Sequence, residues 1–270
     1  MRGVILWLCL VLAAFAQERI VTLSPSLSEI VFGLGHGQEL VGVSSFAAWP
    51  EAVKAIEKIG GYLAPDLEKI LSLRPTLVIG QEHHAALLVK LRALGLQTLQ
   101  VNLNRIEGIE QGIKSIADSI HADNAGELIG AIEQARREAP KLQHPRSVLI
   151  VFGLTYDLRD RIFAAGHNLY FEQIIETCGA TNAYTADDTG QPVLSYEGLI
   201  ALDPDVIILL HSEQTDAPAD PEQLKRSWYA LPVKAAEHGR IYIADAGLIA
   251  IPSHRVAESI KTLCELITRD

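Results

Sequence analysis

The sequence predicts an α/β fold with two similar lobes, and three observations support this. A helix–strand unit occurs twice, as DLEKILSLRPTLVIG at 66–80 and as SYEGLIALDPDVIIL at 195–209. Short apolar strands alternate with helices around both copies, which is typical of parallel sheets. The segment 105–142 has amphipathic helical patterns and no strand pattern. Together these features predict two Rossmann-like lobes with parallel sheets, joined by a long backbone helix.

The two copies of the unit align without a gap. Glu68 then falls on Glu197, and Pro75 falls on Pro204. Each copy has a helical turn with one apolar face, a proline that ends it and an apolar strand. Chance could produce one such match, because helix–proline–strand units are common. The agreement of Glu, Leu, Pro and Ile at one offset makes a duplicated lobe the better explanation.

The first residues, 1–16, have the pattern of a signal peptide. One Arg precedes an apolar run, and Ala14-Phe15-Ala16 fits a peptidase site with small residues. The run is shorter than the about 20 residues that a membrane helix needs. We expect cleavage after residue 16 and export to the periplasm, with a retained N-terminal anchor as the alternative.

The remaining chain divides into three parts by pattern. Residues 17–104 form the predicted N-terminal lobe and residues 144–270 the C-terminal lobe. Between them, 105–143 holds the stretches IEGIEQGIKSIADSI and AGELIGAIEQARREA, separated by one polar break. Both stretches have helical apolar periodicity. We therefore expect a stiff helical connection and small lobe movements on ligand binding.

The composition argues for a binding protein. The formal charge of −10 argues against nucleic acid or an anionic membrane surface as a partner. The sequence has no GxSxG elbow, P-loop or dinucleotide fingerprint, and its Gly33-x-Gly35-x-Gly37 follows a helix instead of opening one. A secreted hydrolase using Asp245, His254 and a serine is the least favoured reading. We expect no enzymatic activity.

Two cysteines remain once the signal peptide is removed. An even pair in an exported protein predicts a disulfide, here between Cys178 and Cys264. It would tie the start of the second lobe to the terminal helix. Two buried free thiols are the alternative.

The sequence resembles the periplasmic substrate-binding proteins of ABC importers for cobalamin, haem or ferric siderophores, in which a rigid helix joins the lobes. The resemblance rests on RIVTLSPSLSEIVFGLG, LVGVSS, both copies of the duplicated unit and the terminal helix with Cys264. It covers nearly all of the chain after residue 16. Cobalamin-binding members are the most similar, because Cys178 and Cys264 match the positions of their disulfide.

The resemblance implies a ligand and a partner. Cobalamin or another corrinoid is the first expectation, followed by haem or a ferric siderophore, and then a bare transition metal. We expect no intrinsic cofactor, a monomer, and a permease dimer as partner. In this family a glutamate on each lobe docks onto permease arginines, and Glu68 and Glu197 occupy the matching positions. The alternative is that both are ordinary first-turn glutamates favoured by the helix dipole.

The ligand is expected in the cleft between the lobes, at loops that follow strands. Cobalamin binders have cleft aromatics at the positions of Phe46 and Tyr62 and an acid at that of Asp245. A tryptophan expected after the first repeat is replaced by Gln81-Glu82-His83-His84. The full set of expected ligand-binding residues is Ser24, Phe46, Trp49, Tyr62, Gln81, His83, His84, Tyr156, Arg159, Arg161, His211, Asp245 and His254.

Three groups in this set suggest particular chemistry. His83 and His84 could bind a metal, since neutral imidazole suits zinc, nickel, copper or a chelated iron or cobalt. The sequence has no metal motif of fixed spacing. A solvated pair on the surface is the alternative. Arg159 and Arg161 suit an anionic ligand, with surface pairing to neighbouring aspartates as the alternative. Ser24 and Ser26, at a helix start, could bind an anion through backbone N–H groups.

Overall fold

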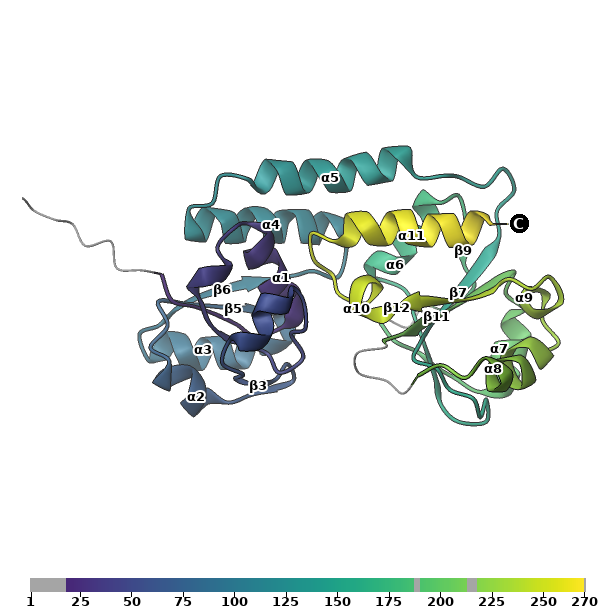
Figure 1. Cartoon of the computed structure of the whole chain (residues 1–270), viewed down its shortest axis with the longest axis horizontal. Helices are drawn as coiled ribbons and strands as arrows, with labels where there is room; N and C mark the ends of the chain where they lie inside the picture. Colours follow the sequence, from purple (N-terminus) through teal and green to yellow (C-terminus); the bar gives the residue numbers. More distant parts are fainter. Residues whose placement is uncertain (1–17, 187–189, 213–217, 270) are drawn as a thin grey trace, which may run out of the picture.

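The computed structural model describes residues 18–186, 190–212 and 218–269. The predicted signal peptide at 1–16 lies outside these residues. Two lobes lie side by side beneath a layer of long helices (Figure 1). No helix in the described ranges is both long and apolar enough to cross a membrane.

The N-terminal lobe contains a four-stranded parallel sheet with the order β2-β1-β5-β6. Its elements are β1 (Ile20–Thr22), α1 (Pro25–Gly33), β2 (Leu40–Val43), β3 (Gly60–Gly61), β4 (Ala64–Pro65), α2 (Leu67–Ser72), β5 (Leu77–Gln81), α3 (Ala85–Ala93) and β6 (Gln97–Val101), with 3-10 turns at Gly37–Glu39, Glu51–Ala55 and Glu82–His84. Neighbouring side chains of β1 enter opposite cores: Ile20 packs with α1, and Val21 packs with α2 and α3. Both faces are therefore buried, as the apolar strands predicted.

The C-terminal lobe contains a mixed sheet with the order β10-β8-β7-β11-β12, and β9 also pairs with β7. Its elements are β7 (Ser147–Phe152), β8 (Ile162–Ala164), α6 (Tyr170–Thr177), β9 (Thr181–Asn182), β10 (Val193–Leu194), α7 (Tyr196–Leu202), β11 (Val206–His211), α8 (Pro221–Ser227), α9 (Lys234–Glu237), β12 (Ile241–Asp245), α10 (Ala246–Ile249) and α11 (Val256–Thr268), with a 3-10 turn at Trp228–Ala230. The parallel prediction holds for β7, β9, β11 and β12. It is wrong for β8 and β10, which are antiparallel. No helix connects β7 to β8, so no crossover can make them parallel.

The duplicated unit has the same backbone form in both lobes. Asp66 caps α2 by accepting from the Lys69 N–H, and Ser195 caps α7 by accepting from the Gly198 N–H. After each helix a left-handed residue precedes the proline, at Arg74 (φ 47°) and at Asp203 (φ 43°). A left-handed residue ends the helix, and the proline cannot continue it.

The predicted long backbone helix is two helices, α4 (Ile106–Ile120) and α5 (Ala125–Glu138). Left-handed His121 (φ 58°) ends α4, and the chain turns back into α5. Helix α5 packs against both α4 and α11 and spans the two lobes in Figure 1. The break between them falls at the polar residues 121–124 that separate the two predicted helical stretches, where both helix ends need solvent or a cap.

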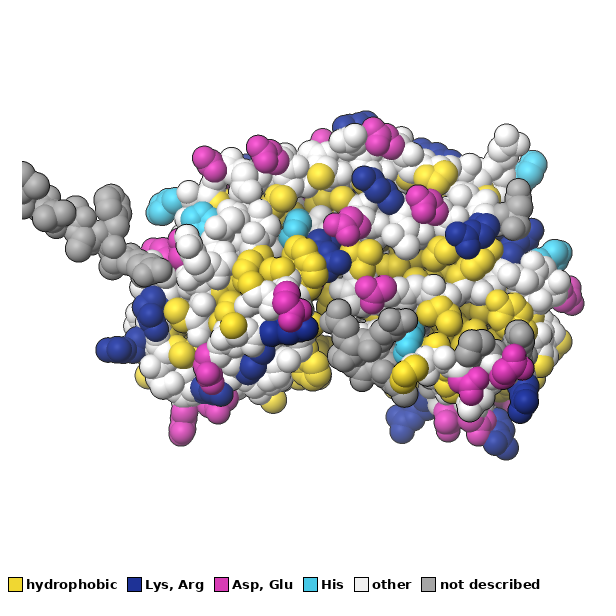
Figure 2. All heavy atoms as spheres, viewed as in Figure 1, with side chains coloured by type: hydrophobic (Ala, Val, Ile, Leu, Met, Phe, Trp, Pro, Cys, Tyr) yellow, Lys and Arg dark blue, Asp and Glu magenta, His cyan; other side chains and the backbone are white. Residues whose placement is uncertain are grey.

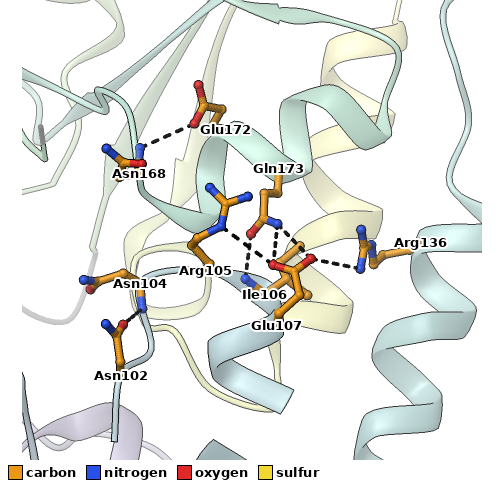
Figure 3. A network of polar contacts seen from close by, with 9 residues as sticks. All are labelled: Asn102, Asn104, Arg105, Ile106, Glu107, Arg136, Asn168, Glu172 and Gln173. Atoms are coloured by element: carbon orange, nitrogen blue, oxygen red, sulfur yellow. Dashed lines mark hydrogen bonds and ion pairs between the residues drawn. The ribbon is translucent and has the colours of Figure 1, made fainter. Parts of the chain in front are cut away.

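The start of α4 is fastened to the C-terminal lobe by a polar network (Figure 3). The Ile106 N–H donates to the Gln173 side chain on α6 (2.7 Å). The Gln173 amide in turn donates to both carboxylate oxygens of Glu107 (2.9 and 2.7 Å). Glu107 also pairs with Arg136 on α5 (3.7 Å) and with Arg105 (3.8 Å). Side chains of α4, α5 and α6 thus meet at the Glu107 carboxylate, which the buried Gln173 holds in place.

The predicted disulfide is confirmed. Cys178, directly after α6, is bonded to Cys264 in the middle of α11, and both residues are fully buried in the main hydrophobic core. The bond ties the second lobe to the terminal helix, on which α5 also packs.

Candidate functional site

A cavity of about 500 Å³ opens between the lobes. Loops after β1, β5 and β12 contribute to it, as expected for ligand sites at the carboxyl ends of parallel strands. Its lining residues are Ser24, Pro25, Ser26, Glu29, Phe46, Ala48, Trp49, Tyr62 and Gln81 from the first lobe and Ser212, Asp245, Ala246, Gly247, Ala250, Ile251, Pro252 and Arg255 from the second.

Aromatic side chains form one wall of the cavity. The Phe46 ring is 61% exposed and meets the edge of Tyr62, with 6.1 Å between ring centroids. Tyr62 is 38% exposed, and Trp49 joins them in the lining. Large aromatic rings left this accessible are available to pack on a flat ligand. The sequence prediction placed all three in the cleft, and the structure brings them together there.

Polar side chains from both lobes face the same cavity. Ser24 follows β1 and Gln81 ends the neighbouring strand β5, so the two side chains meet at one sheet edge. The Gln81 amide donates to the Ser24 hydroxyl (2.9 Å). Asp245 ends β12 and caps α10 by accepting from the Gly247 N–H (2.8 Å). All three predicted residues thus line the cavity.

His84 has a structural role. It is buried, and its Nδ1 accepts from the Gln81 N–H (3.0 Å). The Nε2 atom lies 2.5 Å from the Tyr62 carbonyl oxygen, so it carries the proton and donates. Burial lowers the pKa of His84 to about 4. Both ring nitrogens are occupied, and the prediction of His84 as a metal ligand is therefore not supported.

His83 lies beside Tyr62 and outside the cavity lining. Its ring meets the Tyr62 ring edge-on at 5.3 Å and lies 3.9 Å from the His84 ring. Burial lowers its pKa. Across the described ranges, no three or more His, Cys, Asp or Glu side chains gather in a way that could hold a metal ion. The arrangement makes His83 a support for the Tyr62 ring.

Charged groups from both lobes meet at the base of the cavity. Glu29 on α1 accepts from the Ser253 hydroxyl (2.6 Å) and pairs with the Arg255 guanidinium (3.3 Å). That guanidinium also lies 4.3 Å from the centre of the Trp49 ring. Burial raises the pKa of Glu29 to about 7. The sequence analysis missed this cluster. Glu29 is the one charged residue of the apolar helix α1, and a charge in such a helix indicates a buried partner.

Two other predicted histidines do not line the cavity. The His254 ring packs so tightly on Gly33 that a Cβ there would lie 2.8 Å from it. Burial, with a contribution from Arg255, lowers the pKa of His254 to about 4. His211 is buried at the end of β11, and its neighbour Ser212 faces the cavity in its place. These imidazoles are packed within the protein rather than presented to a ligand.

The predicted group around Arg159 lies elsewhere. Tyr156 and Arg159 line a separate hollow of the second lobe, together with Glu197. Arg159 pairs with Asp157 (2.6 Å), and this hydrogen bonding lowers the pKa of Asp157 to about 2. Arg161 is exposed and does not line the cleft cavity. The surface-pairing alternative therefore describes Arg159, and none of these three side chains enters the cleft.

The two predicted docking glutamates are exposed at equivalent positions. Glu68 lies in the first turn of α2 and Glu197 in the first turn of α7. Figure 1 shows both helices at the ends of the lobes that point away from the α4–α5–α11 layer. Charged side chains gather at the same ends of both lobes in Figure 2. The arrangement gives each lobe one carboxylate on a common side of the molecule.

Comparison with known proteins identifies the chain's relatives. Over 265 residues it is 28% identical to YvrC, an ABC transporter substrate-binding lipoprotein of Bacillus subtilis, covering 94% of this chain and 81% of that one. It is 26% identical over 259 residues to the vitamin B12-binding protein of Vibrio campbellii, covering 94% and 91%.

Solved structures share the two-lobed fold. The haem-binding protein RhuT from Roseiflexus sp. RS-1 is 28% identical with a TM-score of 0.76, covering 93% of this chain and 98% of that one. The vitamin B12-binding protein BtuF of Vibrio cholerae has the same fold, with a TM-score of 0.76 at 22% identity over 93% and 96% of the chains. The family model described as "Periplasmic binding protein" matches residues 20–248. The chain therefore belongs to the periplasmic binding protein family.

Proposed function

We propose that this protein is the substrate receptor of an ABC importer and that its ligand is a metal-chelate tetrapyrrole, with cobalamin or another corrinoid first. The cavity between the lobes carries this proposal. It combines the aromatic wall of Phe46, Trp49 and Tyr62 with polar groups from both lobes. A flat macrocycle with a polar rim suits such a lining.

The polar lining favours a corrinoid over a porphyrin. A corrinoid rim carries carboxamide groups, which donate and accept hydrogen bonds. The cavity offers matching neutral or acceptor groups in Ser24, Gln81, Ser212 and Asp245. The rim of haem carries carboxylates, which prefer cations. Among the described lining residues Arg255 supplies one cation, which it shares with Glu29, so the lining offers little positive charge for two haem carboxylates. The vitamin B12-binding relatives support the same ranking.

Haem is the second candidate, and one residue favours it. The phenol of Tyr62 is partly exposed in the cavity wall, and a tyrosine oxygen can bind haem iron. The likeness to a haem-binding protein at 28% identity supports this alternative. A bare transition metal on the histidine pair has no support from the geometry, because both nitrogens of His84 are bonded to the backbone.

The same proposal includes compartment and partner. Export through residues 1–16 would place the protein in the periplasm, where a monomer delivers ligand to a permease dimer. Glu68 and Glu197 are the proposed docking groups, one on each lobe. Paired charges at a symmetric interface fix orientation and speed encounter. We propose transport binding without catalysis.

Parallel titrations test the ligand. Purified protein from residue 17 onward is titrated with cyanocobalamin and with haemin, followed by calorimetry, tryptophan fluorescence and the haem absorption spectrum. Tyr62→Phe keeps the ring and removes the phenol, so it should leave a corrinoid bound and should abolish an iron–tyrosinate spectrum. Tyr62→Ala should weaken either ligand. Tyr196→Phe, outside the cavity, is the matched control. A protein that binds neither ligand would refute the tetrapyrrole assignment.

A further inference from the structure

The N-terminus of α1 opens into the cleft cavity without a side-chain cap. Ser24, at the cap position, makes no capping hydrogen bond, because its hydroxyl accepts from Gln81. Pro25 has no N–H, and the first helical bond runs from the Ser28 N–H to the Ser24 carbonyl (3.3 Å). Within the described residues, the N–H groups of Ser26 and Leu27 have no hydrogen-bond partner. Buried N–H groups of this kind are costly unless a ligand or water satisfies them.

The Ser26 side chain points to the same conclusion independently. Ser26 is 4% exposed and lines the cavity. Within the described residues its hydroxyl has no hydrogen-bond partner, and it is not among the fully buried side-chain atoms, so it stays accessible from the cavity. A hydroxyl that faces a cavity and has no partner in the protein is available to hydrogen-bond a ligand. A group on the ligand that accepts hydrogen bonds would satisfy it.

A fixed cation lies beside this helix end. Ser26 and Glu29 are three residues apart on α1 and so share one face. Glu29 holds Arg255, whose side chain is 11% exposed, lines the cavity and has a buried Nε without a partner in the described structure. The helix dipole and the guanidinium both favour negative charge here. The Glu29 carboxylate opposes it, and this opposition falls as Glu29 is protonated, because burial raises the pKa of Glu29 to about 7.

We propose that the end of α1 is an anion subsite of the cleft and that the transported chelate carries a carboxylate or phosphate group. The Ser26 N–H group, the Ser26 hydroxyl and the Arg255 guanidinium bind that group. The inference rests on the proposed function and narrows its ligand. Haem offers propionate carboxylates and cobalamin offers a phosphodiester, whereas a bare metal ion offers neither.

Matched ligand pairs test the subsite. Calorimetry compares cyanocobalamin with dicyanocobinamide, which lacks the phosphodiester and its nucleotide, and haemin with haemin dimethyl ester. The pair members differ in more than charge, so the quantity of interest is the change that Ser26→Ala makes to each ligand. We expect Ser26→Ala to weaken the member that carries the anionic group about tenfold and to leave the member without it unchanged. The pair that shows this difference identifies the source of the anion.

A second variant tests the subsite without removing a contact. Ser26→Asp places a carboxylate at the helix N-terminus, where the dipole stabilises it. It should keep the thermal stability of the native protein and abolish its preference for the anionic ligand. Ser119→Ala, on the exposed face of α4, should change nothing.

The outcomes separate the subsite from the function. If Ser26→Ala weakened both members equally in every pair that binds, or if the preference survived in Ser26→Asp, the subsite would be overturned and the receptor function would stand. Absence of binding by all four ligands would overturn the tetrapyrrole receptor and the subsite together.

Discussion

Glu29 and Arg255 join the two lobes at the base of the cleft, with 3.3 Å between Oε1 and Nη1. Glu29 lies on α1 of the first lobe, and Arg255 directly precedes α11 of the second. Their side chains are 3% and 11% exposed. Removing one member of a buried ion pair leaves the other charge uncompensated. This contact therefore couples the geometry of the cleft to the protonation of one carboxyl.

The pH dependence of stability should reveal that carboxyl. Burial raises the pKa of Glu29 from 4.5 to about 7. Between these values the folded protein binds a proton that the unfolded chain releases, so the free energy of unfolding falls as pH rises through this window. Glu29→Gln removes this effect. As pH rises from acid to neutral, the free energy of unfolding of the native protein should therefore fall relative to that of Glu29→Gln. We expect this relative change to be on the order of 3 kcal/mol at most.

Denaturant titrations across this pH range measure the difference. Glu68→Gln, an exposed glutamate on α2, should show no such trend. Parallel curves for the native protein and Glu29→Gln would mean that Glu29 stays ionised throughout.

Reduction of the disulfide should destabilise the second lobe. Cys178 and Cys264 are 86 residues apart, and their bond closes a long loop in the unfolded chain. Loss of such a bond typically costs about 2–5 kcal/mol. Chemical denaturation with and without a thiol reductant should show a shift of this size. A Cys178→Ala/Cys264→Ala variant should have the stability of the reduced protein, with or without the reductant. If the reductant still destabilised this variant, the effect would not come from the Cys178–Cys264 bond.

Local patterns predicted much of the fold and the aromatic half of the site. The duplicated unit located both lobes, because a helix, a proline and an apolar strand leave a clear trace in sequence. Cysteine parity predicted the Cys178–Cys264 bond, which the structure confirms. Phe46 and Tyr62 were expected in the cleft and line it.

The features that sequence reasoning missed depend on distant partners. Arg255 meets Glu29 across 226 positions, and no periodicity connects them. His84 reads as a surface residue of a polar loop, yet it is buried by the hairpin that carries Tyr62. Strand β10 is two residues long, too short for alternation to show its antiparallel pairing.

Gln173 should be required for the stability of the helical layer. It is buried and is the shared partner of the Ile106 N–H and the Glu107 carboxylate. Gln173→Ala leaves the Ile106 N–H unpaired and removes the hydrogen-bond donor of the Glu107 carboxylate, which should cost about 1–3 kcal/mol of unfolding free energy. Gln134→Ala, which loses an exposed hydrogen bond on α5, should cost little. Equal stability of the two variants would show that the network in Figure 3 is dispensable.

His84 and His83 should differ in what they support. His84→Ala removes hydrogen bonds to the Gln81 N–H and the Tyr62 carbonyl, so we expect a loss of about 1–3 kcal/mol. His83 is exposed beside the Tyr62 ring, so His83→Ala should leave stability nearly unchanged and alter ligand affinity. Thermal unfolding combined with ligand titration distinguishes the two.

The lowered pKa of His84 also predicts how stability depends on pH. Its folded value is about 4, lowered from 6.5, so the unfolded chain binds the proton between these values and native stability falls as pH falls through that window. His84→Ala should lose less stability on acidification than the native protein does. If His84→Ala lost as much stability on acidification as the native protein, the loss would come from another titrating group.

Glu68 and Glu197 should act in permease docking and not in ligand binding. Each lies exposed in the first turn of its helix, at the same end of its lobe and outside the cavity lining. Glu68→Ala and Glu197→Ala should each weaken binding to the cognate permease in lipid nanodiscs by on the order of tenfold, more strongly at low ionic strength. Ligand affinity should be unchanged. Glu127→Ala is the matched control, because Glu127 is also an exposed first-turn glutamate but lies on α5, in the opposite helical layer. If Glu127→Ala weakened docking as much as the other two, general surface charge would explain the effect, and the duplicated glutamates would be ordinary helix-start residues.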